Sequence, residues 1–379
     1  MAKFDYNKIF GSTIEAFQSF LKVPSTVTRF GSHVRDCNDL KRVMIIVVVA
    51  LIPAFLVGTY NVGLQHSLAA GLDMGFWQMF FYGLLKVIPL YLVSYIVGLA
   101  IEFGSAQIKG HEVNEGYLVS GMIIPLIMPV DVPLWILALA VVFAVIIGKE
   151  IFGGTGMNIW NPALLARAFV FFAYPSAASG DSVWYAKSAV FGLGKDIDAF
   201  TGATALSQAS EGAFSAAGVG QWSIADMLIG LMPGSVGETS VIAIAIGAII
   251  LIWTGVASWK IMVSSVLGAL AIGGLCNLCA PDAASYLAMP AWYHLIIGGF
   301  AFGTVFMATD PVTSAQTEGG KWIYGFLVGA FCVILRVFNP GYPEGMMLSI
   351  LLMNTFAPLI DHCVVSRNIK RRLARSQQK

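Results

Sequence analysis

The sequence is poor in charge: only 11% of its 379 residues are Asp, Glu, Lys or Arg, against about 25% in an average soluble domain. Cysteine and histidine number five each, and the formal net charge is only +1. These scarcities exclude a large water-covered surface, a disulfide-rich secreted scaffold and a nucleic-acid-binding protein. Cys276 and Cys279 form a C-x-x-C without a second pair, so no structural metal site is expected. The patterns GxxxxGK[ST], GxGxxG, HExxH and GxSxG are absent as well.

Apolar residues dominate the composition of the chain. They make up 57% of the chain, and the mean hydropathy is +0.78. The 40 glycines suit close contact between helices in lipid. The composition therefore predicts a polytopic membrane protein.

A short amphipathic helix is predicted before the first apolar segment of the chain, because Phe10, Ile14, Phe17 and Leu21 recur at helical spacing. That helix lies either on the membrane or a partner, or on the cytoplasmic side of the protein itself.

Ten apolar segments follow, and several reach the roughly 17–25 residues that cross a bilayer. They lie near 43–60, 78–102, 116–130, 133–149, 162–175, 239–257, 261–279, 291–309, 322–338 and 346–360. Segments 116–130 and 162–175 are short and contain or adjoin proline. Because broken backbone is not tolerated against lipid, these two are expected to be discontinuous helices inside a bundle.

Basic residues indicate the orientation. Seven of the 22 Lys and Arg residues lie in 1–42 and six follow residue 366. Both termini are therefore expected to be cytoplasmic, which requires an even number of crossings, and ten crossings agree. The expected fold is all-α with two inverted five-helix repeats, 43–175 and 239–361. They are joined by an external loop, 176–238, and followed by a basic cytoplasmic tail, 362–379.

A weak internal similarity supports the repeats. IFGGTGMNIWNPALLARAF in the first half and VFNPGYPEGMMLSILLMNTF in the second each place a Gly/Asn/Pro-rich break before a helix. LIMPVDVPLW and FMATDPVTS likewise place Asp131 and Asp310 beside proline. Inverted repeats with paired broken helices are typical of ion-translocating proteins, whose sites lie where the breaks meet. Chance similarity between Gly/Pro-rich loops is the alternative.

Charges within membrane segments are costly, so each marks a candidate site. Lys86 and Arg167 lie deep in their segments, which favours pairing or ligand contact. Glu102 and Asp361 lie near segment ends, where snorkelling to the interface is an alternative explanation without function.

The external loop contains FTGATALS (200–207), a small-residue turn with three hydroxyl groups. Its TGAT resembles the [ST]-G-A-T signature at which flavin mononucleotide (FMN) is attached to the final threonine. Two related families of membrane proteins carry this signature: the B subunit of the sodium-translocating NADH:quinone reductase and the D subunit of the Rnf complex. GKEIFGGTG, NPALLARAF, FMATDPV, NPGYPEGMM and RNIKRRLAR resemble the former, and the similarity runs from about residue 20 to the end.

The resemblance implies two flavins. FMN would be held by a phosphoester to Thr204, where Gly202 lets the backbone approach the phosphate and Ala203 avoids crowding it. A riboflavin would bind without a covalent link near the cytoplasmic side. Asn158 and Asn161 match positions associated with it, and their amides suit the donors and acceptors of a flavin edge.

The resemblance also implies sites for sodium and quinone. Glu102 and Asp361 match acidic positions implicated in sodium uptake or release. Gly98, at the inner end of the second segment, matches a quinone-site position. Leu99 stands where many relatives have a second glycine, so the shape of that pocket can differ here.

The sequence is thus interpreted as a membrane flavoprotein subunit of a sodium-transporting NADH:ubiquinone reductase, a translocase that is not active alone. It would carry electrons through FMN and riboflavin to ubiquinone or menaquinone, coupled to Na⁺ export across a bacterial inner membrane. Expected partners include an NADH-oxidising flavoprotein and a second subunit with covalent FMN. The alternatives are the D subunit of an Rnf-type complex, serving ferredoxin and NAD, and a secondary transporter or channel without a redox group. The basic end RNIKRRLAR argues against the Rnf type.

Overall fold

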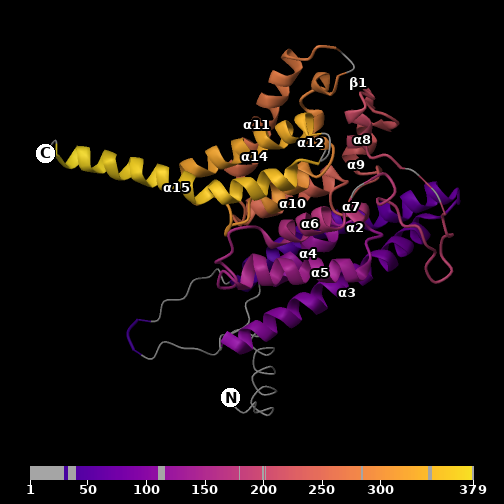
Figure 1. Ribbon diagram of the computed structural model, residues 1–379, viewed down its shortest axis with the longest axis horizontal. Coiled ribbons are helices and arrows are strands. Elements are labelled where there is room, and N and C mark those ends of the chain that lie inside the picture. Colours follow the sequence, from indigo (N-terminus) through magenta and orange to yellow (C-terminus); the bar gives the residue numbers. More distant parts are fainter. Residues whose placement is uncertain are drawn as a thin grey trace, which may run out of the picture.

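The computed structural model describes residues 30–32, 40–109, 116–178, 180–198, 200, 202–282, 285–339 and 344–377. These residues form a mostly helical protein with one small sheet (Figure 1). The predicted amino-terminal amphipathic helix and Thr201 lie outside the described residues.

The first half contains two long helices and several short ones. Its elements are α2 (Leu40–Ala70), α3 (Phe76–Lys109), α4 (Tyr117–Ile127), α5 (Leu134–Val145), the π-helical segment η1 (Ile146–Glu150) and α6 (Pro162–Ala173). Helices α4 and α6 have 11 and 12 residues, or about 16–18 Å, too short to cross a bilayer alone. The two segments predicted to be discontinuous are therefore confirmed as short helices.

The second half also combines long helices with short ones. Its elements are α10 (Val241–Trp253), α11 (Trp259–Leu278), the 3₁₀ turn η2 (Tyr286–Ala288), α12 (Tyr293–Ile296), α13 (Phe300–Phe302), the π-helical segment η3 (Gly303–Met307), α14 (Glu318–Phe338) and α15 (Met346–Gln377). The expectation of one continuous segment over 291–309 is wrong. The chain breaks between α12 and α13, where Gly298 adopts a left-handed φ of 64° that ends the helix.

Among the described residues, five helices are long and apolar enough to cross a membrane: α2, α3, α11, α14 and α15. This confirms an all-α polytopic membrane protein with additional short apolar helices. The number of ten crossings remains a prediction.

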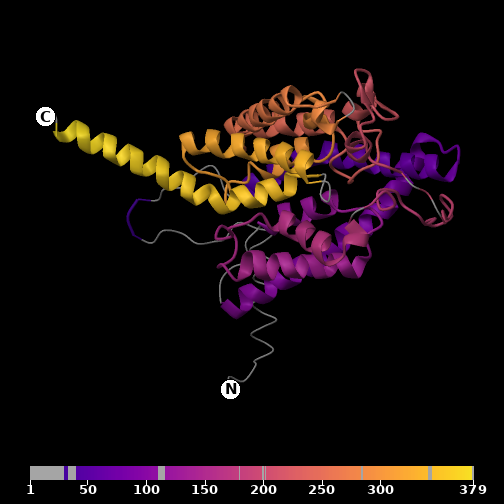
Figure 2. The same ribbon diagram turned by 45° about the horizontal axis from the view of Figure 1, so that its top comes forward.

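Helix pairing groups the two halves side by side (Figure 2). Helix α3 packs on α2 and α5, and α5 packs on α6; in the other half α14 packs on α11 and α15. The α11–α14 contact requires glycine, because a Cβ on Gly268 or Gly329 would lie 2.1 Å or 1.9 Å from a backbone oxygen of the facing helix. Helix α2 reaches across to α10 and so ties the halves together.

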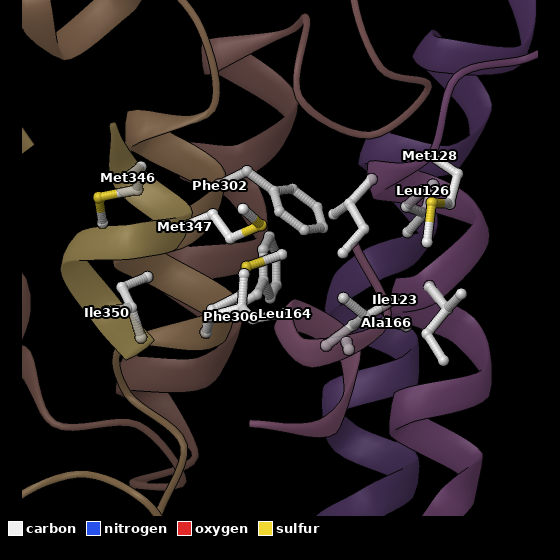
Figure 3. Packing of buried hydrophobic residues seen from close by; sticks show 14 of the residues in the cluster. Ile123, Leu126, Met128, Leu164, Ala166, Phe302, Phe306, Met346, Met347 and Ile350 are labelled. Atoms are coloured by element: carbon white, nitrogen blue, oxygen red, sulfur yellow. The ribbon is translucent and has the colours of Figure 1, made fainter. Parts of the chain in front are cut away.

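An apolar layer fills the space between the halves (Figure 3). Helices α4 and α6 contribute one side of it, and α13, η3 and α15 the other. Its labelled members are Ile123, Leu126, Met128, Leu164, Ala166, Phe302, Phe306, Met346, Met347 and Ile350. All of them belong to the main buried cluster, so the broken helices of both halves meet in one packed core.

The segment between the halves has structure of its own. It contains α7 (Pro175–Ala178), α8 (Ala205–Ser210), α9 (Ile224–Ile229) and an antiparallel sheet of β1 (Phe214–Ser215), β2 (Gly218–Val219) and β3 (Trp222–Ser223). A second buried cluster joins α8 and α9 to 289–297 of the second half. In Figures 1 and 2 the α8–β1 region lies toward the end of the molecule opposite the tip of α15.

Helix α15 does not stop at the predicted boundary between membrane repeat and tail. It runs unbroken for 32 residues from Met346 to Gln377, about 48 Å. The basic tail predicted from residue 362 is therefore the continuation of the last apolar helix.

Candidate functional site

The TGAT string is held at the start of α8. Thr204 is the N-cap residue, and its Oγ1 accepts a hydrogen bond from the Ser207 backbone N–H at 3.2 Å. Before it, the Gly202 N–H donates to the Asp181 carbonyl oxygen at 3.1 Å. The Ala203 carbonyl accepts from the Gln208 side-chain amide at 3.2 Å. The threonine oxygen therefore has a defined position rather than sitting on a free loop.

Thr204 lines a cavity of about 220 Å³, hereafter the Thr204 cavity. The loop between the halves supplies Trp184 and Asp181, and the break between α12 and α13 supplies Gly298 and Gly299. This cavity therefore forms where the loop meets the broken helix of the second half. Its threonine hydroxyl, aromatic ring and glycine wall fit a group linked to Thr204 that carries a flat ring system.

A buried arginine organises one wall of the Thr204 cavity. Arg167 of α6 is only 5% exposed, and its guanidinium pairs with Glu344 and lies 3.5 Å from Glu238. It also donates to the Ser235 hydroxyl at 3.0 Å, and its Cζ lies 5.9 Å from the centre of the Trp184 ring, within cation–π range. The prediction that Arg167 is paired is confirmed.

Glu238, at the end of the loop, is one of the acids on this wall. Burial raises the pKa of Glu238 above its usual range. The Arg167 guanidinium counteracts this and the nearby Glu344 carboxylate adds to it. Sequence reasoning missed Glu238 and Glu344, since each adjoins a helix end where an acid is ordinarily solvent-exposed.

A second cavity, of about 90 Å³, lies between the halves and is hereafter the Asn161 cavity. Asn161 caps α6 by accepting from the Ala163 N–H at 3.0 Å, and its side-chain nitrogen lies 3.4 Å from an Asp310 carboxylate oxygen. Asn158 also lines this cavity, with its amide donating to the Trp160 carbonyl at 3.1 Å.

The Asn161 cavity offers unused hydrogen-bonding capacity. Thr155 lines it, and its buried Oγ1 has no hydrogen-bond partner within the described part of the chain. An orphaned hydroxyl beside two amides suits a ligand with several polar edge atoms, as a flavin has. The predicted pair Asn158 and Asn161 is therefore brought together, with Asp310 from the break of the other half.

Glu102 is buried inside the protein rather than exposed on its surface. It is 5% exposed in α3 and forms an ion pair with Lys149 of η1, which is 3% exposed. Lys149 in turn lines the Asn161 cavity, although Glu102 does not. Glu102 thus contacts that cavity through one lysine.

Asp361 and Gly98 lie apart from both cavities. The Asp361 carboxylate accepts from the backbone N–H groups of Gln316 and Thr317 and from the Thr317 hydroxyl at 2.6 Å, which ties α15 to the start of α14. Gly98 faces Tyr117 of α4, and a Cβ there would lie 1.8 Å from the tyrosine ring. The contact between α15 and α14 therefore accounts for Asp361, and the close approach of the Tyr117 ring accounts for the glycine at position 98.

Comparisons with known proteins find relatives over nearly the whole chain. The family described as NQR2, RnfD, RnfE matches residues 27–370. A protein of Ectopseudomonas mendocina is 46% identical over 96% of this chain and 93% of its own length. One of Chromohalobacter salexigens is 44% identical over 98% of this chain and 92% of its own. Both relatives are named as the B subunit of Na(+)-translocating NADH-quinone reductase.

Proposed function

The chain belongs to the NQR2, RnfD, RnfE family, and we propose that it acts as the B subunit of a Na⁺-translocating NADH-quinone reductase. The 44–46% identity to proteins of that name over nearly the whole chain supports this role over an Rnf-type one. The protein is a membrane part of an oxidoreductase complex, with NADH oxidised elsewhere in that complex. We place it in a bacterial inner membrane, with both termini cytoplasmic and Thr204 outside.

Covalent FMN on Thr204 is the first part of the proposal. The observation that carries it is the threonine oxygen held at the rim of a cavity beside Trp184. Trp184 lines the same cavity as Thr204 and would contact the ring system. The flavin supplies the electron chemistry, while these residues orient it and limit water.

Riboflavin in the Asn161 cavity is the second part. Asn158, Asn161 and Thr155 would hydrogen-bond its polar edges, and Lys149 provides a positive charge on the same cavity wall. For sodium we keep Glu102 and Asp361 as the proposed acids, and for ubiquinone or menaquinone the region of Gly98. The partners would be an NADH-oxidising flavoprotein and a second subunit with covalent FMN.

The attachment is tested by peptide mass mapping of the protein purified from a host that flavinylates the wild type. Thr204→Ala should lose the FMN mass and nearly all electron transfer to quinone, whereas Thr204→Ser should keep part of both. Ser207→Ala is the matched control, because Ser207 lines the same cavity three residues away and should retain full flavin. FMN still attached in Thr204→Ala would refute this residue as the carrier.

Loss of the Thr204 hydroxyl also removes a helix cap, which costs about 1 kcal/mol of stability. Inserted protein should therefore remain after the substitution, and its amount should be measured beside its flavin content. A fall in flavin per inserted protein, rather than in total flavin, is the informative result.

A further inference from the structure

The part of α15 that follows Asp361 extends away from the rest of the protein (Figures 1 and 2). Every residue of this helix from 367 to 377 is exposed. Three apolar residues nevertheless recur there at intervals of four, and they are hereafter called the α15 stripe: Val365, Ile369 and Leu373. Their exposed fractions are 45%, 52% and 56%. Residues four apart lie on one face of an α-helix, so the α15 stripe forms an apolar edge that is open to its surroundings.

The same stretch carries charge of one sign only. Residues 362–379 include six Lys and Arg residues and no Asp or Glu. Arg371 lies four residues after Arg367 and four residues before Arg375. Like charges at this spacing repel one another and destabilise a helix. A surface rich in Asp and Glu would relieve the repulsion, so the charges indicate an acidic binding partner.

The α15 stripe lies far along the helix from its membrane segment. Asp361 is the first charged residue of α15, and Ile369 and Leu373 follow it by about 12 Å and 18 Å of helix. The headgroup region on each side of the hydrocarbon core is only about 5–8 Å thick. The preference for positive charge on the cytoplasmic side explains basic residues next to a span, but it requires no apolar stripe beyond them. The position of the stripe therefore favours a water-soluble protein over lipid as its partner.

We propose that the end of α15 binds in an apolar groove with an acidic rim on a water-soluble protein at the cytoplasmic side. Amphipathic helices are bound in this way, with apolar residues four apart in the groove and basic residues paired at its rim. A second copy of this chain does not fit, because it would present the same positive charges. The amino-terminal stretch 1–29 does not fit either, since its four Lys and Arg residues outnumber its two acids.

The identity of the partner and the docking surface rest on different observations. That the partner is another subunit of the quinone reductase complex rests on the proposed function. The surface itself rests on the α15 stripe, the charge of 362–379 and the length of the helix.

The first test is photo-crosslinking in the purified complex, with p-benzoylphenylalanine in place of Ile369 or, as a control, of Ala374. Ala374 is exposed as well, and at about 100° per residue it lies about 140° from the middle of the α15 stripe. Irradiation should attach position 369 to a peptide of another subunit that contains Asp and Glu, at least fivefold more than position 374. An adduct with a phospholipid, with stretch 1–29 or with a second copy of this chain, or no adduct at all, would overturn the proposal.

The second test measures how firmly the crosslinked subunit is held. Ile369→Asp with Leu373→Asp places two charges on the α15 stripe and should raise the Kd for that subunit at least tenfold, measured by native mass spectrometry of the diluted complex. Asn368→Asp with Ala374→Asp is the matched control, because it adds the same two charges about 100° and 140° from the middle of the stripe. Equal Kd values for the two double variants would refute the docking surface.

Two further measurements separate this surface from the proposed function. Covalent flavin per inserted protein should be the same in both double variants as in the wild type, because the tail lies away from the Thr204 cavity. A wild-type complex without quinone reductase activity would refute the proposed function. An active complex that holds its subunits equally well without Ile369 and Leu373 would refute the docking surface alone.

Discussion

The buried pair of Glu102 and Lys149 allows a quantitative test of how the proposed sodium acid is held. Each side chain is 4% exposed, so removing Glu102 takes the carboxylate away from a buried lysine, and removing Lys149 takes the cation away from a buried carboxylate. Such a loss costs about 3–5 kcal/mol, whereas replacing both partners with apolar side chains of similar volume is often neutral or stabilising. We therefore expect Glu102→Leu and Lys149→Met each to lower the free energy of unfolding by about 3–5 kcal/mol, and the double variant to recover most of that loss.

Titration with SDS in mixed micelles measures the free energies that complete this double-mutant cycle. The control is the neighbouring pair of Lys109 and Glu150, whose lysine side chain is 36% exposed. Lys109→Met should cost about 1 kcal/mol or less because water screens the exposed partner. A cost below about 1 kcal/mol for either buried single variant, or a double variant no more stable than the weaker single, would refute the reasoning.

The double variant also separates stability from ion transport. A complex that carries Glu102→Leu with Lys149→Met should assemble and keep its covalent FMN, and its riboflavin content is measured separately because Lys149 lines the Asn161 cavity. If Glu102 takes part in sodium uptake, its quinone reduction should no longer respond to Na⁺. An unchanged response would remove Glu102 from the sodium path and leave it a structural role.

Three further predictions concern other sites. Gly98→Ala places a Cβ within 1.8 Å of the Tyr117 ring and should lower the free energy of unfolding by about 1–3 kcal/mol in the same titration. Gly104→Ala is the control, because Gly104 lies in the same helix with open space around it, and this change should be neutral or stabilising. Equal effects of the two changes would contradict the packing argument. Asn161→Ala should lower the riboflavin content per covalent FMN, measured by extraction and mass spectrometry. It should also lower the free energy of unfolding by about 1 kcal/mol, because α6 loses its N-cap. Full riboflavin occupancy in this variant would place that flavin elsewhere. Reporter fusions at Gly220 should report the external side and fusions after Lys379 the cytoplasm, and a cytoplasmic result for Gly220 would invalidate the five-plus-five topology.

The membrane class and two of the broken helices could be predicted from sequence, because both depend on local composition. Long apolar runs identified the spanning helices, and proline marked the interruptions at 116–130 and 162–175. The break at Gly298 was missed because a glycine pair inside an apolar run is equally typical of a helix contact. The helical continuation past Asp361 was also missed, because a change from apolar to basic residues alters the surroundings of a helix and not its backbone.

For the candidate site, too, residues with a local signal could be predicted from the sequence and their distant partners could not. Thr204, Asn158 and Asn161 were proposed because short strings around them resemble those of a known family, and in the structure they line two cavities. The partners of these residues come from far along the chain: Lys149 pairs with a residue 47 positions earlier, and Glu344 with one 177 positions earlier. A sequence read alone contains no signal for such pairs, so the acids around Arg167 and the lysine behind Glu102 required the three-dimensional fold.

The unbroken course of α15 has a mechanical consequence. Asp361 anchors the middle of this helix to Gln316 and Thr317 at the start of α14. From there to Met346 is about 22 Å of helix, which begins directly after Glu344 and its contact with Arg167. Pro358 lies between this contact and Met346, and its missing N–H allows the helix to bend there. A load on the part of α15 after Asp361 is therefore taken up at the contact with α14 and at Pro358, which isolates the Arg167–Glu344 contact beside the Thr204 cavity from movement of the tail.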